Sequence, residues 1–364
     1  MKNNIWKNDK GFLIFVVIAF AFPFIFALLG RTGLTEGTNK FWQGQLINFF
    51  IMAVFAMSYD LLIGYAGMLS FGHAASFGGG AYTVAMLLSH VAPNILKSYQ
   101  IFIGNINITE IVILIVCFLA AILVSILIGL LFGASAMRVK GAYFAMLTLA
   151  LSTALNLLTR ATDFVEWTGA DEGMHGVPVP MWINPTQNRL TFYFIALAFM
   201  VIAYLLMKRI VSSPTGRVVQ ATRENEDRSR MIGYNPVTYR TLAFVIASVF
   251  AGIAGGLYSL WTTSATPSMT SGVTTVNVLI MTILGGMGTL TGPILGAGIM
   301  QIFSQFFYTW FGARWPLVFG IIFVLIVMFL PYGIIGTWRL QGFKLKQGWQ
   351  RLIDLTKTKE TSKK

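Results

Sequence analysis

The stretch IVILIVCFLAAILVSILIGLLFGASA, residues 111–136, contains no charged residue over its whole length. About 20 consecutive apolar residues are enough for a helix to cross the hydrocarbon core of a bilayer, so this stretch predicts a membrane-spanning helix. Similar stretches recur along the chain and predict spans of the same kind. The ten predicted spans lie near residues 11–29, 46–66, 73–92, 110–136, 141–159, 191–209, 240–262, 274–287, 291–311 and 316–332. The expected fold class is therefore all-α, a polytopic membrane helical bundle of about ten transmembrane helices.

The composition supports a membrane protein and argues against several other classes. Of the 364 residues, 56% are hydrophobic and 11% are charged, which is too apolar for an ordinary soluble domain. The single cysteine, Cys117, lies in an apolar stretch and has no partner for a disulfide within the chain. The sequence patterns of the common phosphate-binding loops, zinc proteases and serine hydrolases do not occur. We therefore expect a multi-pass protein of the cell membrane that is not an enzyme and itself binds no metal or cofactor.

The basic residues indicate how the spans are oriented. If the N-terminus lies in the cytoplasm and successive spans alternate, the cytoplasmic segments hold most of the 26 Lys and Arg residues, as the positive-inside rule requires. Both termini are then cytoplasmic. The chain divides into a transmembrane domain over residues 1–338, which includes a cytoplasmic loop over 208–240, and a basic cytoplasmic tail over 339–364. The net charge of +13 reflects this orientation in the lipid bilayer, so no nucleic-acid partner is expected.

Two glycine-rich segments are predicted to interrupt helices inside the membrane. They are GYAGMLSFGHAASFGGGAY, residues 64–82, and GGMGTLTGP, residues 285–293. Irregular backbone at membrane depth is tolerated only where protein or water satisfies its polar groups, so both segments are expected to face the bundle interior or a translocation route. The residues concerned are Gly64, Gly67, Ser70, Gly72, His73, Gly285, Gly286, Gly288, Gly292 and Pro293. For the glycine clusters at 78–80 and 252–256, close helix packing is the favoured interpretation.

Asp60 is the only acidic residue well inside an apolar stretch. An ionisable side chain in a span is costly and points to function, so Asp60 is a candidate residue of the translocation route. A structural role is equally open, in which Asp60 accepts hydrogen bonds from backbone amides freed at the break between residues 64 and 72. His73 is expected to order the local backbone rather than relay protons, because a relay needs several ionisable partners across the membrane.

The loop 208–240 carries seven basic and three acidic residues between two apolar stretches. Ser213 is a plausible helix N-cap and Pro214 suits the first helical position, so a short helix is expected from about residue 215. A second turn is expected to end at Gly233. A solvated loop held to anionic lipid by its arginines is the alternative, but a capped helical insert in two parts favours a docking element.

Three segments together resemble the permease subunits of branched-chain amino acid ABC importers. They are YDLLIGYAGMLSFGHAASFGGGAY (59–82), SPTGRVVQATRENEDRSRMIGYN (213–235) and VLIMTILGGMGTLTGPILGA (278–297). The resemblance covers the chain from about residue 59 to 335 and implies an importer driven by ATP. It also implies that the loop docks in a cleft of an ATPase, through Gly216, Arg217, Arg223, Glu224, Glu226 and Gly233. The chain departs from the family pattern at residues 227–229, where Asp, Arg and Ser replace small residues.

The same resemblance implies a set of partners. They are a second homologous permease subunit, two ATPase subunits that use ATP and Mg, and an extracytoplasmic solute-binding protein. Urea permeases share the glycine-rich segments, so a urea or other small-solute ABC permease is an alternative. The segment TGADEGMHGVPVP, residues 168–180, resembles an external loop of the amino acid importers and favours the branched-chain reading. A secondary transporter driven by an ion gradient is the alternative from another class, and it would require more intramembrane carboxylates than Asp60.

Overall fold

The computed structural model describes residues 10–30, 33, 37–98, 102–103, 106–136, 139, 141–329 and 333–337. The predicted basic tail, 339–364, and the basic residues of the first nine positions lie outside these ranges. The described helices are α1 (Lys10–Gly30), α2 (Gly37–Asp60), α3 (His73–Met86), α4 (Ala92–Ser98), α5 (Ile108–Ala136), α6 (Ala142–Arg160), α7 (Val165–Thr168), α8 (Arg189–Ser212), α9 (Pro214–Glu224), α10 (Glu226–Met231), α11 (Pro236–Thr262), α12 (Gly272–Gly285), α13 (Thr291–Phe311) and α14 (Trp315–Phe329). Two short antiparallel pairs of strands are also described, β1 (Phe102–Ile103) with β2 (Ile106–Asn107) and β3 (Met174–His175) with β4 (Ser264–Ala265).

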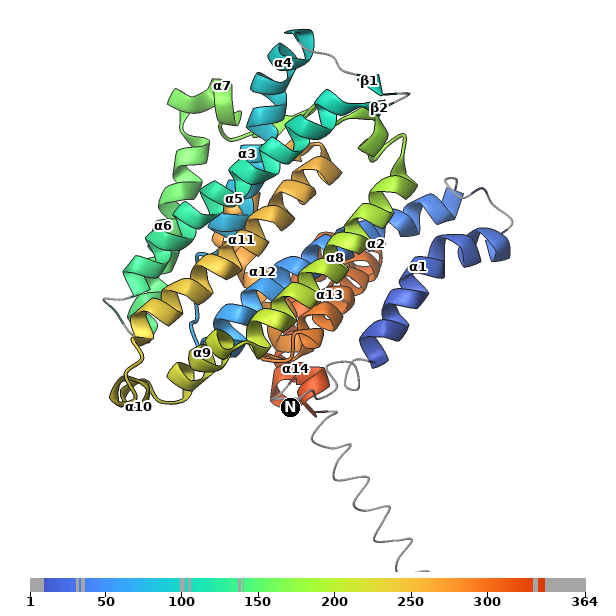
Figure 1. Ribbon diagram of the computed structural model, residues 1–364. Coiled ribbons are helices and arrows are strands. Elements are labelled where there is room, and N and C mark those ends of the chain that lie inside the picture. The colour runs from blue at the N-terminus through green and yellow to red at the C-terminus, as the bar shows by residue number, and fades with distance from the viewer. Residues whose placement is uncertain are drawn as a thin grey trace, which may run out of the picture.

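The helical membrane bundle predicted from the apolar stretches is confirmed. A helix occupies each of the ten predicted ranges, although α2 begins well before residue 46. Within the described part of the chain, six helices are long and apolar enough to cross a membrane: α1, α2 with the π-helical turn that follows it, α5, α6, α8 and α11. The short helix α12 is apolar as well. The α9–α10 segment lies at one end of the bundle, and α4 and α7 lie at the opposite end (Figure 1).

Small residues allow the central helices to pack closely. A Cβ atom added at Gly80 on α3 would lie 2.0 Å from the carbonyl oxygen of Gly252 on α11. A Cβ at Gly255 would lie 1.8 Å from the carbonyl oxygen of Phe77. No side chain fits in either place, because the backbones themselves are in contact. The packing role expected for these two glycine clusters is therefore confirmed.

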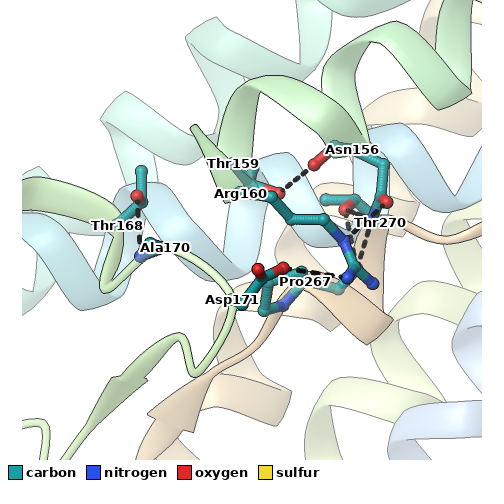
Figure 2. A network of polar contacts seen from close by, with 8 residues as sticks. All are labelled: Asn156, Thr159, Arg160, Thr168, Ala170, Asp171, Pro267 and Thr270. Carbon is teal, nitrogen blue, oxygen red and sulfur yellow. Dashed lines mark hydrogen bonds and ion pairs between the residues drawn. The ribbon is translucent and has the colours of Figure 1, made fainter. Parts of the chain in front are cut away.

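A network of polar contacts joins several segments at the end of the bundle that carries α7 (Figure 2). Asn156, near the end of α6, donates hydrogen bonds to the carbonyl oxygen of Pro267 (2.6 Å) and to Thr270 Oγ1 (2.7 Å). Arg160, the last residue of α6, forms an ion pair with Asp171 at 3.0 Å. These contacts, together with the β3–β4 pair, join the long loop after α6 to the loop after α11.

Candidate functional site

The first break follows α2 directly. A π-helical turn, Leu61–Tyr65, extends α2, and the chain then leaves helical geometry until α3 begins at His73. Gly67 has a φ of +69°, which side-chain-bearing residues rarely adopt. The Tyr59 hydroxyl donates to the carbonyl oxygen of Ser70 at 2.9 Å, and the Gly72 amide donates to Ser70 Oγ at 3.2 Å. The irregular segment is thus fixed against the helix that precedes it.

Hydroxyl groups from two other helices satisfy the amides at the start of α3. The first amides of a helix have no partner within the helix. Thr148 Oγ1 of α6 accepts from the Phe71 amide at 3.1 Å, and Thr275 Oγ1 of α12 accepts from the Ala74 amide at 3.0 Å. Gly72 packs closely against Phe132 of α5, since a Cβ there would lie 2.1 Å from an atom of the Phe132 ring.

His73 is fully buried at the first position of α3. Its Nε2 lies 2.8 Å from Ser58 Oγ, and that hydroxyl donates to the carbonyl oxygen of Phe55 at 2.7 Å. Because the hydroxyl proton is used in this way, His73 Nε2 is the donor to Ser58. The imidazole also stacks on the Phe55 ring, with 5.4 Å between the centroids. The side chain therefore binds the start of α3 to α2, in agreement with an ordering role.

The second break lies between α12 and α13. Gly286, Gly288 and Leu290 have positive φ values of 119°, 75° and 53°, so the backbone reverses sharply. The Thr289 hydroxyl replaces part of the lost helical bonding, because it donates to the carbonyl oxygen of Gly286 (2.8 Å) and accepts from the amide of Gly292 (2.9 Å).

The α12–α13 contact explains the other residues predicted for this segment. A Cβ at Gly285 would lie 1.8 Å from the carbonyl oxygen of Gly292, so the last turn of α12 and the first turn of α13 touch through their backbones. Pro293 is buried in the first turn of α13, where a missing amide proton costs nothing.

Asp60 connects the two breaks. Its Oδ1 accepts from the Gly288 amide at 2.7 Å, and its Oδ2 accepts from the Leu290 amide at 3.2 Å. The fully buried carboxylate therefore satisfies amides in the second break. Gly64 lies against this contact, since a Cβ there would be 2.0 Å from Asp60 Oδ1 and 2.5 Å from the Gly288 amide nitrogen.

The structural alternative for Asp60 was wrong about which break supplies the amides. It expected donors between residues 64 and 72. In that segment the Ala66 and Met68 amides instead donate to the carbonyl oxygens of Leu61 and Leu62, at 3.1 and 2.9 Å. Carbonyl oxygens of the π-helical turn thus satisfy these amides, and the Asp60 carboxylate binds the second break.

The loop 208–240 has the capped, two-part form predicted from its sequence. Ser213 Oγ accepts from the Gly216 amide at 3.1 Å, and Pro214 is the first residue of α9. Gly216 is required there, because a Cβ would lie 2.3 Å from the carbonyl oxygen of Ile210. Helix α10 is capped by Asn225 and is followed by Gly233 at a φ of +95°. The predicted cap and glycine stop are both confirmed.

Arg223, near the end of α9, reaches from the loop into the first break. Its guanidinium donates to the carbonyl oxygen of Gly64, and its aliphatic part packs on Gly67. Its positive charge also interacts with the Asp60 carboxylate. The resemblance assigned Arg223 to ATPase docking, and the structure adds a direct contact with the break. Arg217 and Glu224, also assigned to docking, are exposed on α9.

Glu226 is engaged within the loop. Its carboxylate pairs with Arg230 at 2.6 Å and with Arg240 at 3.1 Å, and its side chain is only 13% exposed. The pair with Arg230 lies within α10, and the pair with Arg240 joins α10 to the start of α11. The resemblance assigned Glu226 to ATPase docking, and the structure adds an ion pair between this carboxylate and Arg240 of α11.

Sequence reasoning missed two exposed apolar residues of the loop. Met231 and Ile232, at the end of α10, are 87% and 67% exposed. Two adjacent large apolar side chains in such positions are typical of an interaction site. The only sequence signal was an apolar pair directly before Gly233 in an otherwise charged segment. We call this pair the apolar tip.

Comparison with known proteins identifies the family. Residues 43–330 match the model of a family described as branched-chain amino acid transport system, permease component. The chain belongs to this family. It is a permease component, not an enzyme, and a multi-pass protein of the cell membrane.

Several known permeases are similar to this chain over most of its length. The chain is similar to the high-affinity branched-chain amino acid transport system permease proteins LivM of Salmonella typhimurium and Escherichia coli. Each is 25% identical over 366 residues, with coverage of 94% of this chain and 78% of the relative. A probable LivM of Methanocaldococcus jannaschii is 26% identical over 318 residues, with coverage of 80% and 92%. No solved structure shows a significant match.

Proposed function

We propose that this permease carries branched-chain amino acids into the cell, using ATP hydrolysis in partner subunits. Its partners would be a second homologous permease subunit, two ATPase subunits that bind ATP and Mg, and an extracytoplasmic solute-binding protein. The chain would cross the membrane ten times with both termini in the cytoplasm. The α9–α10 segment would then be the cytoplasmic coupling element. Family membership and the names of the relatives support the substrate and the ATP-driven machine.

One continuous set of contacts carries the mechanistic part of this proposal. Arg223 of the loop binds the Gly64 carbonyl in the first break, and Asp60, next to that contact, binds the amides of Gly288 and Leu290 in the second. A movement of α9 is therefore passed to both breaks without an intervening flexible segment. This is the arrangement expected of a loop that converts ATP-driven closure of partner subunits into a change inside the membrane.

The first break also supports a water-filled route. Gly67 and Leu69 are exposed, and within the described part of the chain their backbone amides have no hydrogen-bond partner. Lipid cannot satisfy these groups, so if this segment lies within the membrane it would border water or a partner subunit. We propose that the two breaks contribute to the translocation pathway.

The exposed apolar tip supports docking over lipid attachment. A loop held to anionic lipid by its arginines would not need a fixed α10, whereas the ion pair between Glu226 and Arg240 joins that helix to α11. We infer that Met231 and Ile232 enter an apolar pocket of the ATPase and that the surrounding arginines face acidic residues at its rim.

Replacing Asp60 by asparagine should reduce uptake while leaving assembly intact. Asparagine offers one acceptor oxygen where the carboxylate offers two, so one of the two backbone amides loses its partner, at a cost of about 1–3 kcal/mol. We expect about a tenfold fall in uptake at normal expression. Transport of radiolabelled leucine into cells, corrected for the amount of permease in the membrane, measures this effect. Full uptake would leave Asp60 without a role in transport.

The proposed orientation is tested by labelling single cysteines in a Cys117→Ser background. Ser268→Cys and Gln187→Cys, both at exposed positions, should react with an impermeant thiol reagent added outside intact cells. Asp227→Cys in the loop should react only after the cells are opened. The reverse pattern would place α9 and α10 outside the cell, away from any ATPase.

The proposed function itself is tested by purification from native membrane, followed by reconstitution in nanodiscs. The permease should copurify with ATPase subunits, and addition of a leucine-loaded binding protein should stimulate ATP hydrolysis. A chain that purifies without ATPase subunits and responds to an ion gradient would be a secondary transporter. Stimulation by urea but not by leucine would show that the chain is an ABC permease whose substrate is urea.

A further inference from the structure

A chain of four side-chain amides joins α2 and α13, well away from both breaks. Asn48 Nδ2 donates to Gln301 Oε1 at 3.0 Å. Gln301 Nε2 donates to Gln45 Oε1 at 2.5 Å, and Gln45 Nε2 donates to Gln305 Oε1 at 3.2 Å. All three bonds run in the same direction, so each inner amide is both donor and acceptor. We call this group the amide chain.

The amide chain borders a cavity of about 720 Å³ between α1, α2 and α13. Gln45 and Gln301 line this cavity, and most of the other lining residues are apolar, among them Phe12, Phe15 and Ile302. Because of the cavity, α1 does not press α13 onto α2 along this side. Amides in apolar surroundings find few alternative partners, so their mutual hydrogen bonds favour one arrangement of the two helices.

A second connection joins the same two helices at their other ends. Asp60, the last residue of α2, binds the amide of Leu290, directly before α13. Gln45 precedes Asp60 by fifteen residues, and Gln305 follows Leu290 by fifteen residues. At a rise of about 1.5 Å per residue, both separations correspond to about 22 Å. The antiparallel helices are thus joined at two positions, which are about 22 Å apart along each helix.

Two connections at different positions along the helices oppose sliding and tilting of one helix against the other. We propose that Gln45, Asn48, Gln301 and Gln305 are positioning residues that make α2 and α13 one rigid body. A displacement of the Asp60 contact, produced through Arg223, then reaches the opposite end of the bundle instead of being absorbed between the helices. This inference rests on the proposed function and names four residues that determine how tightly ATP hydrolysis is coupled to uptake.

The test replaces the amide chain by a covalent link that can be added at will. In a Cys117→Ser background, Asn48→Cys with Gln301→Cys removes two of the three bonds. Before cross-linking, the ATP hydrolysed per leucine transported in proteoliposomes should rise about fivefold, because the helices move independently. After reaction with a short bifunctional thiosulfonate, the ratio should return close to that of the parent complex.

Two results would contradict the proposal that α2 and α13 form one rigid body, which we call the rigid pair. One is a parental ratio before cross-linking, which would mean that the amides do not position the helices. The other is loss of uptake after cross-linking, which would mean that α2 and α13 must slide during transport. The ratio of each single-cysteine variant should not change when the same reagent is added. Gln305→Met, which removes only the last bond, should raise the ratio less and covers the case in which the double variant does not assemble.

The parent complex, measured in parallel, separates this inference from the proposed function. Leucine-stimulated hydrolysis by the parent, together with an unchanged ratio in every variant, would overturn the rigid pair alone. Absence of stimulated hydrolysis in the parent would overturn the proposed function, and the rigid pair with it.

Discussion

Replacing Met231 and Ile232 together by aspartate is expected to abolish leucine-stimulated ATP hydrolysis in the reconstituted complex. Both side chains are largely exposed and make the apolar tip of α10. Carboxylates in their place could enter an apolar pocket only after desolvation, at a cost of several kcal/mol. Membrane insertion should be unchanged, because neither side chain packs within the bundle. Stimulated hydrolysis in nanodiscs, with the amount of copurified ATPase, measures the effect.

A matched control adds the same two charges beside the loop. Ser212→Asp with Thr238→Asp changes exposed positions at the end of α8 and in the first turn of α11. This variant should retain most of the stimulated hydrolysis. Equal activity in both double variants would show that α10 does not dock through its apolar tip, and would leave lipid attachment as the better description of the loop.

Replacing Arg223 by alanine should prevent movement of the loop from reaching the two breaks, while the ATPase subunits stay bound. The substitution removes the hydrogen bond to the Gly64 carbonyl and the positive charge near Asp60. A hydrogen bond from a charged donor contributes about 1.5–3 kcal/mol, and partial exposure of Arg223 favours the lower end of that range. Uptake should fall about tenfold, while ATPase subunits still copurify.

Arg209→Ala serves as the control, since Arg209 is an exposed arginine in the last turn of α8, the helix that precedes α9. Its loss removes the same charge from the same face of the bundle. If both variants transport leucine equally well, the contact between Arg223 and Gly64 does not carry the coupling. Arg223→Lys, which keeps the charge but has fewer donors, should give intermediate uptake.

Much of the fold could be predicted because bilayer thickness imposes a minimum length on apolar stretches. The stretch at 111–136 became α5, and the other predicted spans also contain helices. Local rules were equally successful where their range is short. Ser213 caps α9 three residues ahead, and Gly233 adopts the positive φ expected of a helix stop.

The contacts that define the site could not be predicted, since they join residues far apart in the chain. Asp60 and Gly288 are separated by 228 positions, and Arg223 and Gly64 by 159. The sequence shows that Asp60 needs donors but not which break supplies them. The pairing of Glu226 with Arg240 spans only 14 positions, but it depends on the turn between α10 and α11, which the sequence does not show.

The central claim is that ATP binding in the partner subunits moves the breaks through Arg223. Spin labels on Met287, an exposed residue of the second break, and on Leu127, an exposed residue of α5, report this movement directly. In a Cys117→Ser background, the distance distribution between the labels should shift when ATP is bound and hydrolysis is blocked. The same shift should be absent in Arg223→Ala. An unchanged distribution in the parent complex, or an equal shift in the variant, would contradict the claim.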